Sequence, residues 1–219
     1  MKNLDKPLVS IICPTYNHEN YIRQCLEGFI NQILDFDIEI IVHDDASTDK
    51  TVEIIKEFES KYPDLFNNIY QIENQFSKDV ASVSRIMYDK ANGKYFAFCE
   101  GDDYWKDPYK LKKQVELLES TNSDFCYSDF DIFFNEENIF KYDIFKNRLS
   151  EINKDKPLLT YGSLGVPSWV FKSDFLKDFD LNSYNISDKS VLILIEFLRT
   201  NGKICFLSES TTVYRKNLN

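Results

Sequence analysis

The sequence predicts an α/β protein whose core is a doubly wound, mostly parallel sheet. Short apolar runs, typical of strands buried on both faces, alternate with longer segments whose apolar residues recur at helical spacing. The resulting order, βαβαβαβ, implies parallel strands joined by right-handed crossovers. The 219 residues, 43% of them hydrophobic, are enough for one sizeable core.

In the N-terminal half, each predicted strand leads into a helix. The first strand is the run LVSIIC, and Ile22, Leu26 and Phe29 then share one face of the helix that follows. Predicted strands cover residues 8–13, 38–43, 68–71 and 94–99, and predicted helices cover residues 19–34, 51–62, 79–91 and 108–120. The last of these helices starts at Asp107-Pro108, where we expect Asp107 to be the N-cap.

The C-terminal half is less regular. A strand is predicted over residues 124–134, followed by a polar segment, 135–156, that we interpret as an internal boundary or a flap. A short strand over residues 168–172, a helix over 188–200 and one or two short strands within 203–216 complete the expected elements.

Composition excludes some functions. The net charge of −10, from 26 basic and 36 acidic residues, argues against binding nucleic acid or anionic membranes through bulk electrostatics. The five cysteines lack CxxC spacing and lie mostly in apolar runs, which predicts buried free thiols in a reducing compartment. The N-terminus has no signal-peptide core and no apolar run is long enough to span a bilayer, so we expect a cytoplasmic protein.

Clusters of acidic residues follow two of the predicted buried strands. FCEGDDYW places Glu100, Asp102 and Asp103 after one strand, and Asp44 and Asp45 follow another. Ligands of open α/β sheets bind outside the carboxyl ends of the strands, and paired carboxylates suit a hard divalent cation that clamps a diphosphate. The alternative is a solvated acidic turn or a helix cap.

Capping is the simpler interpretation for the polar residues just after the second strand, Ser47, Thr48 and Asp49. The two histidines, His18 and His43, lack metal-ligand spacing and are interpreted as turn or strand-end residues. No glycine-rich phosphate-binding motif occurs among the six glycines. A bound diphosphate therefore requires another partner, and a metal on Asp102 and Asp103 is the economical candidate.

Several segments, in this order and spacing, make the sequence resemble the family 2 glycosyltransferases. These segments are LVSIICPTYNHENYIRQCLEGFINQ, EIIVHDDASTDKT, ANGKYFAFCEGDDYWKDPYKLKKQVELLE, and the spacing from Asp188 to Tyr214-Arg215. The resemblance implies a GT-A fold and transfer of a sugar from a nucleotide diphosphate donor with inversion at the anomeric carbon. It also implies a saccharide or lipid-linked saccharide acceptor, bacterial surface polysaccharide as the product, and Mn²⁺ or Mg²⁺ as cofactor.

The resemblance also assigns roles to individual residues. It implies a donor-nucleotide site made by Pro14, Thr15, Tyr16, Asn17, Asp44, Asp45 and Asp102. Within that site Asp45 would face the uracil edge and Tyr16 would offer a stacking face. Asp103, with Asp102, would bind the metal, and Asp188 would be the catalytic base. Candidate contacts to the donor sugar or acceptor are Glu100, Trp105 and Trp169, with core packing the alternative for Trp169.

The chain departs from the family pattern at three places. Ser187 stands where many members carry a glutamate, and Ala46 stands where many carry a glycine. Many members also continue beyond Tyr214-Arg215 with a histidine and further helices. We therefore expect one catalytic domain over residues 1–219, with a nucleotide-sugar half near 1–120 and an acceptor half near 121–219. On this interpretation it is trimmed at its C-terminus, and the missing region would associate with the inner face of the membrane.

Two other functions fit parts of the pattern. A sugar-phosphate nucleotidyltransferase shares the nucleotide-binding sheet and the metal acids, but such enzymes usually carry a basic, glycine-rich signature where PTYNHEN stands. A non-catalytic nucleotide-sugar-binding module would keep the fold without the chemistry. Retention of all four key aspartates, Asp45, Asp102, Asp103 and Asp188, favours the glycosyltransferase.

Overall fold

The computed structural model describes residues 6–146, 165–176, 193 and 200–216. The strands are β1 (Val9–Thr15), β2 (Ile38–Asp44), β3 (Ile69–Tyr70), β4 (Tyr95–Phe98), β5 (Tyr104–Trp105), β6 (Phe125–Phe134), β7 (Ile139–Lys141), β8 (Trp169–Lys172) and β9 (Ile204–Lys216). The helices are α1 (Ile22–Ile30), α2 (Thr51–Lys61), α3 (Val80–Lys90) and α4 (Lys110–Thr121), with short 3₁₀ turns η2 (Val166–Ser168) and η3 (Ser173–Leu176). Among the described helices, none is long and apolar enough to cross a bilayer.

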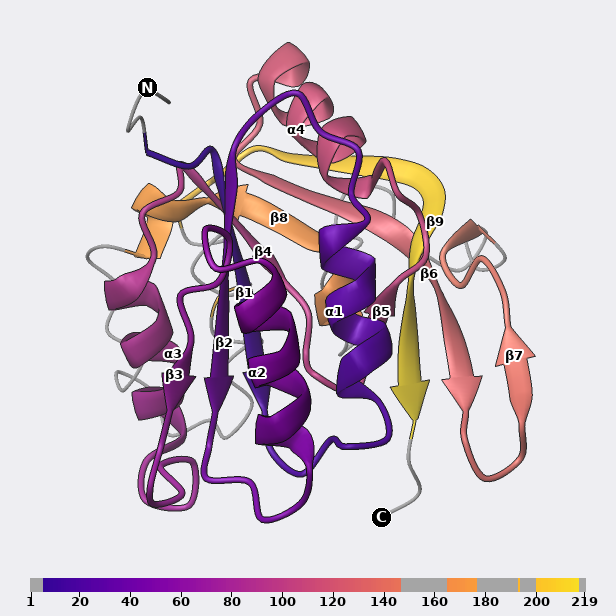
Figure 1. Cartoon of the computed structure of the whole chain (residues 1–219). Coiled ribbons are helices and arrows are strands. Elements are labelled where there is room, and N and C mark those ends of the chain that lie inside the picture. The colour runs from indigo at the N-terminus through magenta and orange to yellow at the C-terminus, as the bar shows by residue number, and fades with distance from the viewer. Residues whose placement is uncertain (1–5, 147–164, 177–192, 194–199, 217–219) are drawn as a thin grey trace.

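All nine strands belong to one mixed sheet (Figure 1). Its order is β3-β2-β1-β4-β8-β6-β9-β5, and β7 pairs with the outer end of β6. β1 lies parallel to both β2 and β4, and β2 lies parallel to β3, so the predicted parallel half is confirmed. The strand order reverses between β1 and β4, and such a switch point leaves a crevice at the carboxyl ends of the two strands.

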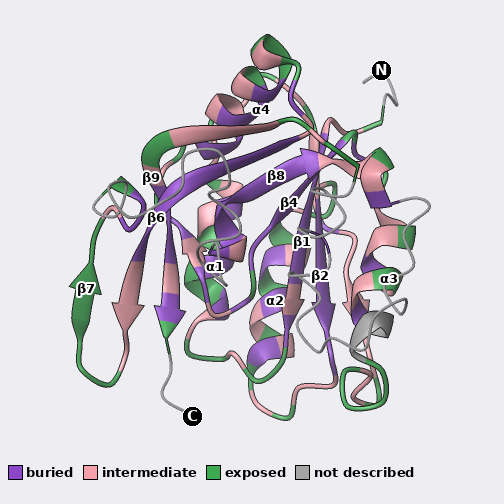
Figure 2. Cartoon of the chain, turned by 180° about the vertical axis from the view of Figure 1, so that it is seen from behind, coloured by how far each residue is buried: buried purple, intermediate pink, exposed green. Residues whose placement is uncertain are grey.

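Two hydrophobic clusters fill the two faces of this sheet. One joins β1 to α1, α2 and α4 through side chains that include Ile11, Leu26 and Leu111. The other joins it to α3 through side chains that include Ile12 and Met87. Figure 2 shows the buried residues concentrated on the strands between these layers. The helices thus cover both faces, as a doubly wound sheet requires.

The second half of the sheet is less parallel than the βαβ pattern implies. β8 runs antiparallel to both β4 and β6, and β5 runs antiparallel to β9. β9 is one long strand rather than one or two short ones, with register shifts against β6 near Ser128 and Asp129. β7 lies within the segment that the sequence predicts to be aperiodic, and residues 147–156 of that segment lie outside the described residues.

The helices are shorter than predicted at positions where the backbone finds another partner. α1 ends at Ile30 rather than near residue 34, because the Ile33 N–H donates to the Pro108 carbonyl at 2.8 Å. α4 begins at Lys110, and Asp107 is not its N-cap; the Asp107 carboxylate instead accepts the Tyr109 N–H in the preceding turn. Most of the predicted helix over residues 188–200 lies outside the described residues.

The cysteine prediction is confirmed as far as the fold tests it. All five thiols are free; Cys13, Cys25, Cys99 and Cys126 are buried, and Cys205 is partly exposed.

Candidate active site at the carboxyl ends of β1 and β4

The turns after β1 and β4 meet at the switch point. The Gly101 N–H donates to the Pro14 carbonyl at 3.0 Å, which ties the turn after β4 to the last residues of β1. A Cβ at Gly101 would lie 2.4 Å from Thr15 Oγ1 and 2.8 Å from His18 Nδ1. Only glycine permits this close approach, so Gly101 brings the acids that follow β4 against the turn that follows β1.

Glu100, Asp102 and Asp103 form a compact carboxylate cluster in that crevice. One oxygen from each carboxylate lies within 4.8 Å of the others. Glu100 is exposed, Asp102 is half-buried and Asp103 is fully buried. Three carboxylates that converge from surface to interior match the oxygen ligands that Mg²⁺ or Mn²⁺ prefers, so this donor set fits a divalent cation.

Asp103 is the fully buried member of the cluster. Its Oδ1 accepts the Arg215 N–H at 2.7 Å, whereas its Oδ2 is buried with no hydrogen-bond donor among the described residues. Burial raises the pKa of the Asp103 carboxyl well above its usual range, and the charges of Asp102 and Glu100 raise it further. A cation beside Oδ2 would offset both effects, which is the physical reason to expect one there.

Arg215, at the end of β9, braces the same turn. Its Nη1 donates to the Asp102 carbonyl and its Nη2 to Gln24 Oε1. The guanidinium carbon lies 5.1 Å from the ring centre of Tyr21 and 4.6 Å from that of Tyr104. The sequence shows Arg215 only through its spacing from Asp188, so its contact with the acid cluster is new information from the fold.

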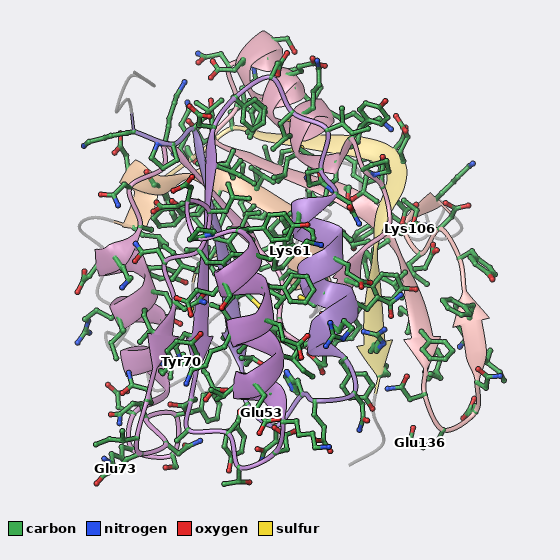
Figure 3. All side chains as sticks on the ribbon, viewed as in Figure 1. Glu53, Lys61, Tyr70, Glu73, Lys106 and Glu136 are labelled. Carbon is green, nitrogen blue, oxygen red and sulfur yellow. The ribbon has the colours of Figure 1, made fainter. Side chains whose placement is uncertain are left out.

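Asp44 and Asp45, at the end of β2, lie beside this crevice but are already hydrogen-bonded. Asp44 accepts the Ser47 N–H at 3.0 Å and the Ser47 hydroxyl at 2.5 Å. Asp45 accepts the N–H groups of Gln75 and Phe76 at 2.7 and 3.0 Å, and thereby holds the loop that follows β3. Figure 3 shows Glu73, on that loop, at the lower end of the molecule, where the parallel strands end.

Tyr16 and Asn17 have different environments within the turn after β1. Tyr16 is 44% exposed, so part of its side chain can contact a ligand in the crevice. Asn17 adopts a left-handed conformation with φ of 55°. Its N–H donates to Ser47 Oγ at 2.9 Å and its Oδ1 accepts the Thr48 N–H at 2.8 Å, so it fastens the β1 turn to the β2 turn.

His18, interpreted from the sequence as a turn residue, lies in the turn after β1, close enough to Asp102 to feel its charge. Its Nδ1 lies 3.1 Å from Thr15 Oγ1, and its backbone N–H donates to Thr51 Oγ1. Burial lowers the pKa of His18, and the nearby Asp102 carboxylate opposes that shift. The only sequence signal for His18 is its place in the turn after β1.

Comparison with known proteins identifies the family of this chain. Residues 10–178 match the family model described as "Glycosyl transferase family 2". The chain belongs to this family. The match includes the β1 turn, Asp44 and Asp45, and the Glu100–Asp103 cluster, and it ends before Asp188 and Arg215.

Curated proteins of similar sequence match about half of this chain. An uncharacterized protein of Mycobacterium tuberculosis is 47% identical over 111 residues, which are 51% of this chain and 31% of the relative. The Escherichia coli protein named "UDP-Glc:alpha-D-GlcNAc-diphosphoundecaprenol beta-1,3-glucosyltransferase WfaP" is 34% identical over 123 residues, 56% of this chain and 46% of that protein. The matched stretch is thus less than half the length of either relative.

Solved structures of similar fold cover most of the chain. Staphylococcus aureus TarS (residues 1–349, in complex with UDP) has a TM-score of 0.72 at 23% identity and covers 95% of this chain and 60% of its own. The mannosyltransferase PcManGT from Pyrobaculum calidifontis, in complex with GDP-Man and Mn²⁺, has a TM-score of 0.68 at 18% identity and covers 96% of this chain and 57% of its own. These likenesses confirm the predicted fold of the GT-A type.

Trp105, expected to contact a sugar, lies instead in the core, and Trp169 takes the core position that was the alternative interpretation for it. Trp105 is 4% exposed, packs on Phe29 at 4.6 Å between ring centres, and donates its indole N–H to the Pro167 carbonyl. Trp169 is 1% exposed and packs on Phe125. Neither ring offers a free face in this structure, so we leave both tryptophans out of the proposed site. Asp188, the expected catalytic base, lies outside the described residues.

Proposed function

We propose that this domain transfers a sugar from a nucleoside diphosphate sugar, with UDP as the nucleotide, to a saccharide or lipid-linked saccharide in surface polysaccharide synthesis. The observation that carries the proposal is the carboxylate cluster at the switch point, where the buried Oδ2 of Asp103 lacks a donor among the described residues. The UDP in the TarS structure, the GDP-Man and Mn²⁺ in the PcManGT structure and the lipid-linked acceptor in the name of WfaP support it.

Within this proposal, each part of the crevice has a role. Asp103 and Asp102 hold the divalent cation with Glu100 beside them, and the cation, when bound, supplies positive charge to the diphosphate leaving group. Tyr16 stacks on the base. The Asp45 oxygens can each accept a second hydrogen bond, which leaves capacity for the uracil N–H beside the loop that Asp45 holds.

Asp188 is the proposed catalytic base, on the family resemblance alone. Inversion requires one base that takes the proton of the acceptor hydroxyl while its oxygen attacks the anomeric carbon and the bond to the diphosphate breaks. No covalent enzyme intermediate is needed. The cytoplasmic location and contact with the inner face of a membrane remain predictions.

The nucleotide is tested first, by thermal unfolding of the protein with UDP, GDP or dTDP, each with Mn²⁺ and with a chelator. We expect UDP with Mn²⁺ to raise the midpoint, because a ligand that binds only the folded state stabilises it. The chelator should remove that effect. Protection by GDP with Mn²⁺ and not by UDP would show that the uridine assignment is wrong.

Asp188→Asn separates chemistry from binding. Asparagine caps a helix about as well as aspartate, so the thermal midpoint and UDP affinity should stay unchanged. Transfer should nevertheless fall by a factor on the order of 100 to 10,000, because the base is lost. Asp64→Asn, at an exposed turn, is the matched control. Near-normal transfer by Asp188→Asn would show that Asp188 is not the catalytic base, and the base would then be one of the acidic residues within 129–143.

A further inference from the structure

Arg215 lies 112 and 113 positions along the chain from Asp103 and Asp102, yet most of its polar contacts go to their turn. Its backbone N–H donates to Asp103 Oδ1, and its Nη1 donates to the Asp102 carbonyl. Its Nη2 donates to Gln24 on α1, so the guanidinium joins α1, the acid turn and β9 at one point. Arg215 is 8% exposed, so these contacts are made away from bulk water.

We propose that Arg215 is a positioning residue, which holds the 102–103 turn so that the oxygens of Asp102 and Asp103 are already placed for the cation. This inference rests on the proposed function, because it takes the carboxylate cluster to be a cation site. Three carboxylates within 4.8 Å repel one another, and without a brace the turn would relax to separate them. The guanidinium supplies an opposite charge and a fixed bond to the backbone between the two aspartates.

The contacts also determine which Asp103 oxygen stays available. Since Oδ1 is held by the Arg215 N–H at 2.7 Å, the carboxylate cannot rotate freely, and Oδ2 keeps one direction. A ligand held in its binding geometry before the cation arrives loses less entropy on binding. Outer residues that orient metal ligands typically change metal affinity by about 10- to 100-fold when they are replaced.

The alternative is that Arg215 binds the diphosphate directly, and the geometry argues against it. The rings of Tyr21 and Tyr104 lie 5.1 and 4.6 Å from the guanidinium carbon, and both terminal nitrogens donate to protein oxygens. Arg215 is 8% exposed, so a phosphate could reach the remaining guanidinium hydrogens only if the side chain turned, and that movement would break these bonds. The positive charge of Arg215 therefore acts on the donor through the acid turn.

The test is calorimetry of Mn²⁺ binding in the presence of UDP, on the wild-type protein and Arg215→Lys. Lysine keeps the charge but lacks the planar fork needed to reach the Asp102 carbonyl and Gln24 together. We expect the Mn²⁺ dissociation constant to rise by about 10- to 100-fold. The affinity for UDP with chelator should not change. Arg23→Lys is the matched control, since Arg23 lies one residue before Gln24 on α1 and is paired with the exposed Glu57.

Three results would overturn the inference. The first is an unchanged Mn²⁺ affinity in a folded Arg215→Lys protein. The second is a loss of metal-free UDP affinity with uridine affinity unchanged, which would make Arg215 a direct phosphate ligand. The third concerns Gln24→Ala, which is used if Arg215→Lys does not fold. This variant removes one acceptor of the guanidinium and should weaken the affinity for Mn²⁺ by a smaller factor, so an unchanged Mn²⁺ affinity would contradict the inference. A wild-type protein that binds no UDP with Mn²⁺ would instead contradict the proposed function.

Discussion

The surroundings of the Asp103 carboxylate disfavour its ionised form. Burial and two neighbouring acids oppose its charge, while the Arg215 N–H is its one described hydrogen-bond donor. Such an arrangement costs stability unless a cation completes it. The same reasoning separates Asp103 from Asp44 and Asp45, whose carboxylates accept two described hydrogen bonds each.

Lys110 is a second buried charge, and it gives a pH-dependent prediction. Burial lowers its pKa to about 7, and its Nζ donates to Gln114 Oε1 at 2.6 Å under the ring of Trp105. From pH 7 to about 10 the unfolded chain holds a proton at Lys110 that the folded chain releases, so this group adds stability as the pH rises.

Lys110→Met removes the pH-dependent contribution of Lys110 to the unfolding free energy. The unfolding free energy of the variant minus that of the wild type should be largest at pH 7 or below. Above pH 7 this difference should decrease by up to about 1.4 kcal/mol per pH unit. Urea unfolding at pH 6, 7, 8 and 9 measures this difference. Lys50→Met, at an exposed position, is the control for loss of a lysine charge. A difference between Lys110→Met and wild type that does not change with pH would contradict the assignment.

Ala46 gives a prediction about backbone strain at the position where many family members carry glycine. Its φ is 65°, a left-handed conformation that costs an L-residue about 1–2 kcal/mol. Ala46→Gly relieves this strain and loses about 0.4–1 kcal/mol through the more flexible unfolded chain. We expect a net gain of about 0.5–1 kcal/mol in urea unfolding. Ala91 does not have a positive φ, so Ala91→Gly should lose stability. An equal loss of stability in Ala46→Gly would show that Ala46 is not strained.

At the scale of elements, the site is assembled by turns that fasten to one another. Asn17 fastens the turn after β1 to the turn after β2, and Asp45 fastens the latter to the loop after β3. Glu19 and Asp49 add a second pair of bonds between the same turns: the Asp49 carboxylate accepts the Glu19 N–H, and the Glu19 carboxylate accepts the Lys50 N–H. The strands therefore determine where each turn begins, and hydrogen bonds between the turns hold their positions relative to one another.

Asn17→Ala tests this coupling. It removes the acceptor for the Thr48 N–H and places alanine at a positive φ, so the unfolding free energy should fall by about 2–3 kcal/mol. Asn17→Gly tolerates the same φ and loses only the hydrogen bond, so its loss should be about 1 kcal/mol. Equal stability of the two variants and the wild type in urea would show that Asn17 does not fasten the turns.

Local pattern predicts some of these elements and not others. The strands β1, β2 and β4 and the acids after them follow from continuous apolar runs that end in charge. The direction of β8, the single long β9 and the bond between Asp103 and Arg215 depend on contacts between residues far apart in sequence, which no local period encodes. Tryptophan suits both a sugar platform and a core, so the sequence leaves both interpretations open for Trp169, and the burial of Trp105 is evident only in the fold.

At the scale of the whole molecule, the switch point of the sheet and the carboxylate cluster coincide. The acid turn after β4 is hydrogen-bonded to β1 through the Pro14 carbonyl and to β9 through Arg215, so one sheet positions it from two sides. The central claim is that this turn binds a divalent cation together with a nucleoside diphosphate.

Calorimetric titration of UDP, with Mn²⁺ or with chelator, into wild-type and Asp103→Asn protein tests that claim most directly. Asparagine keeps the shape and an acceptor for the Arg215 N–H, and it removes a buried charge, so the thermal midpoint without metal should not fall. Wild-type protein should bind UDP with Mn²⁺, and Asp103→Asn should bind it about 100-fold more weakly, which corresponds to about 2.7 kcal/mol. Equal UDP affinity in the two proteins, or in wild type with and without chelator, would contradict the account.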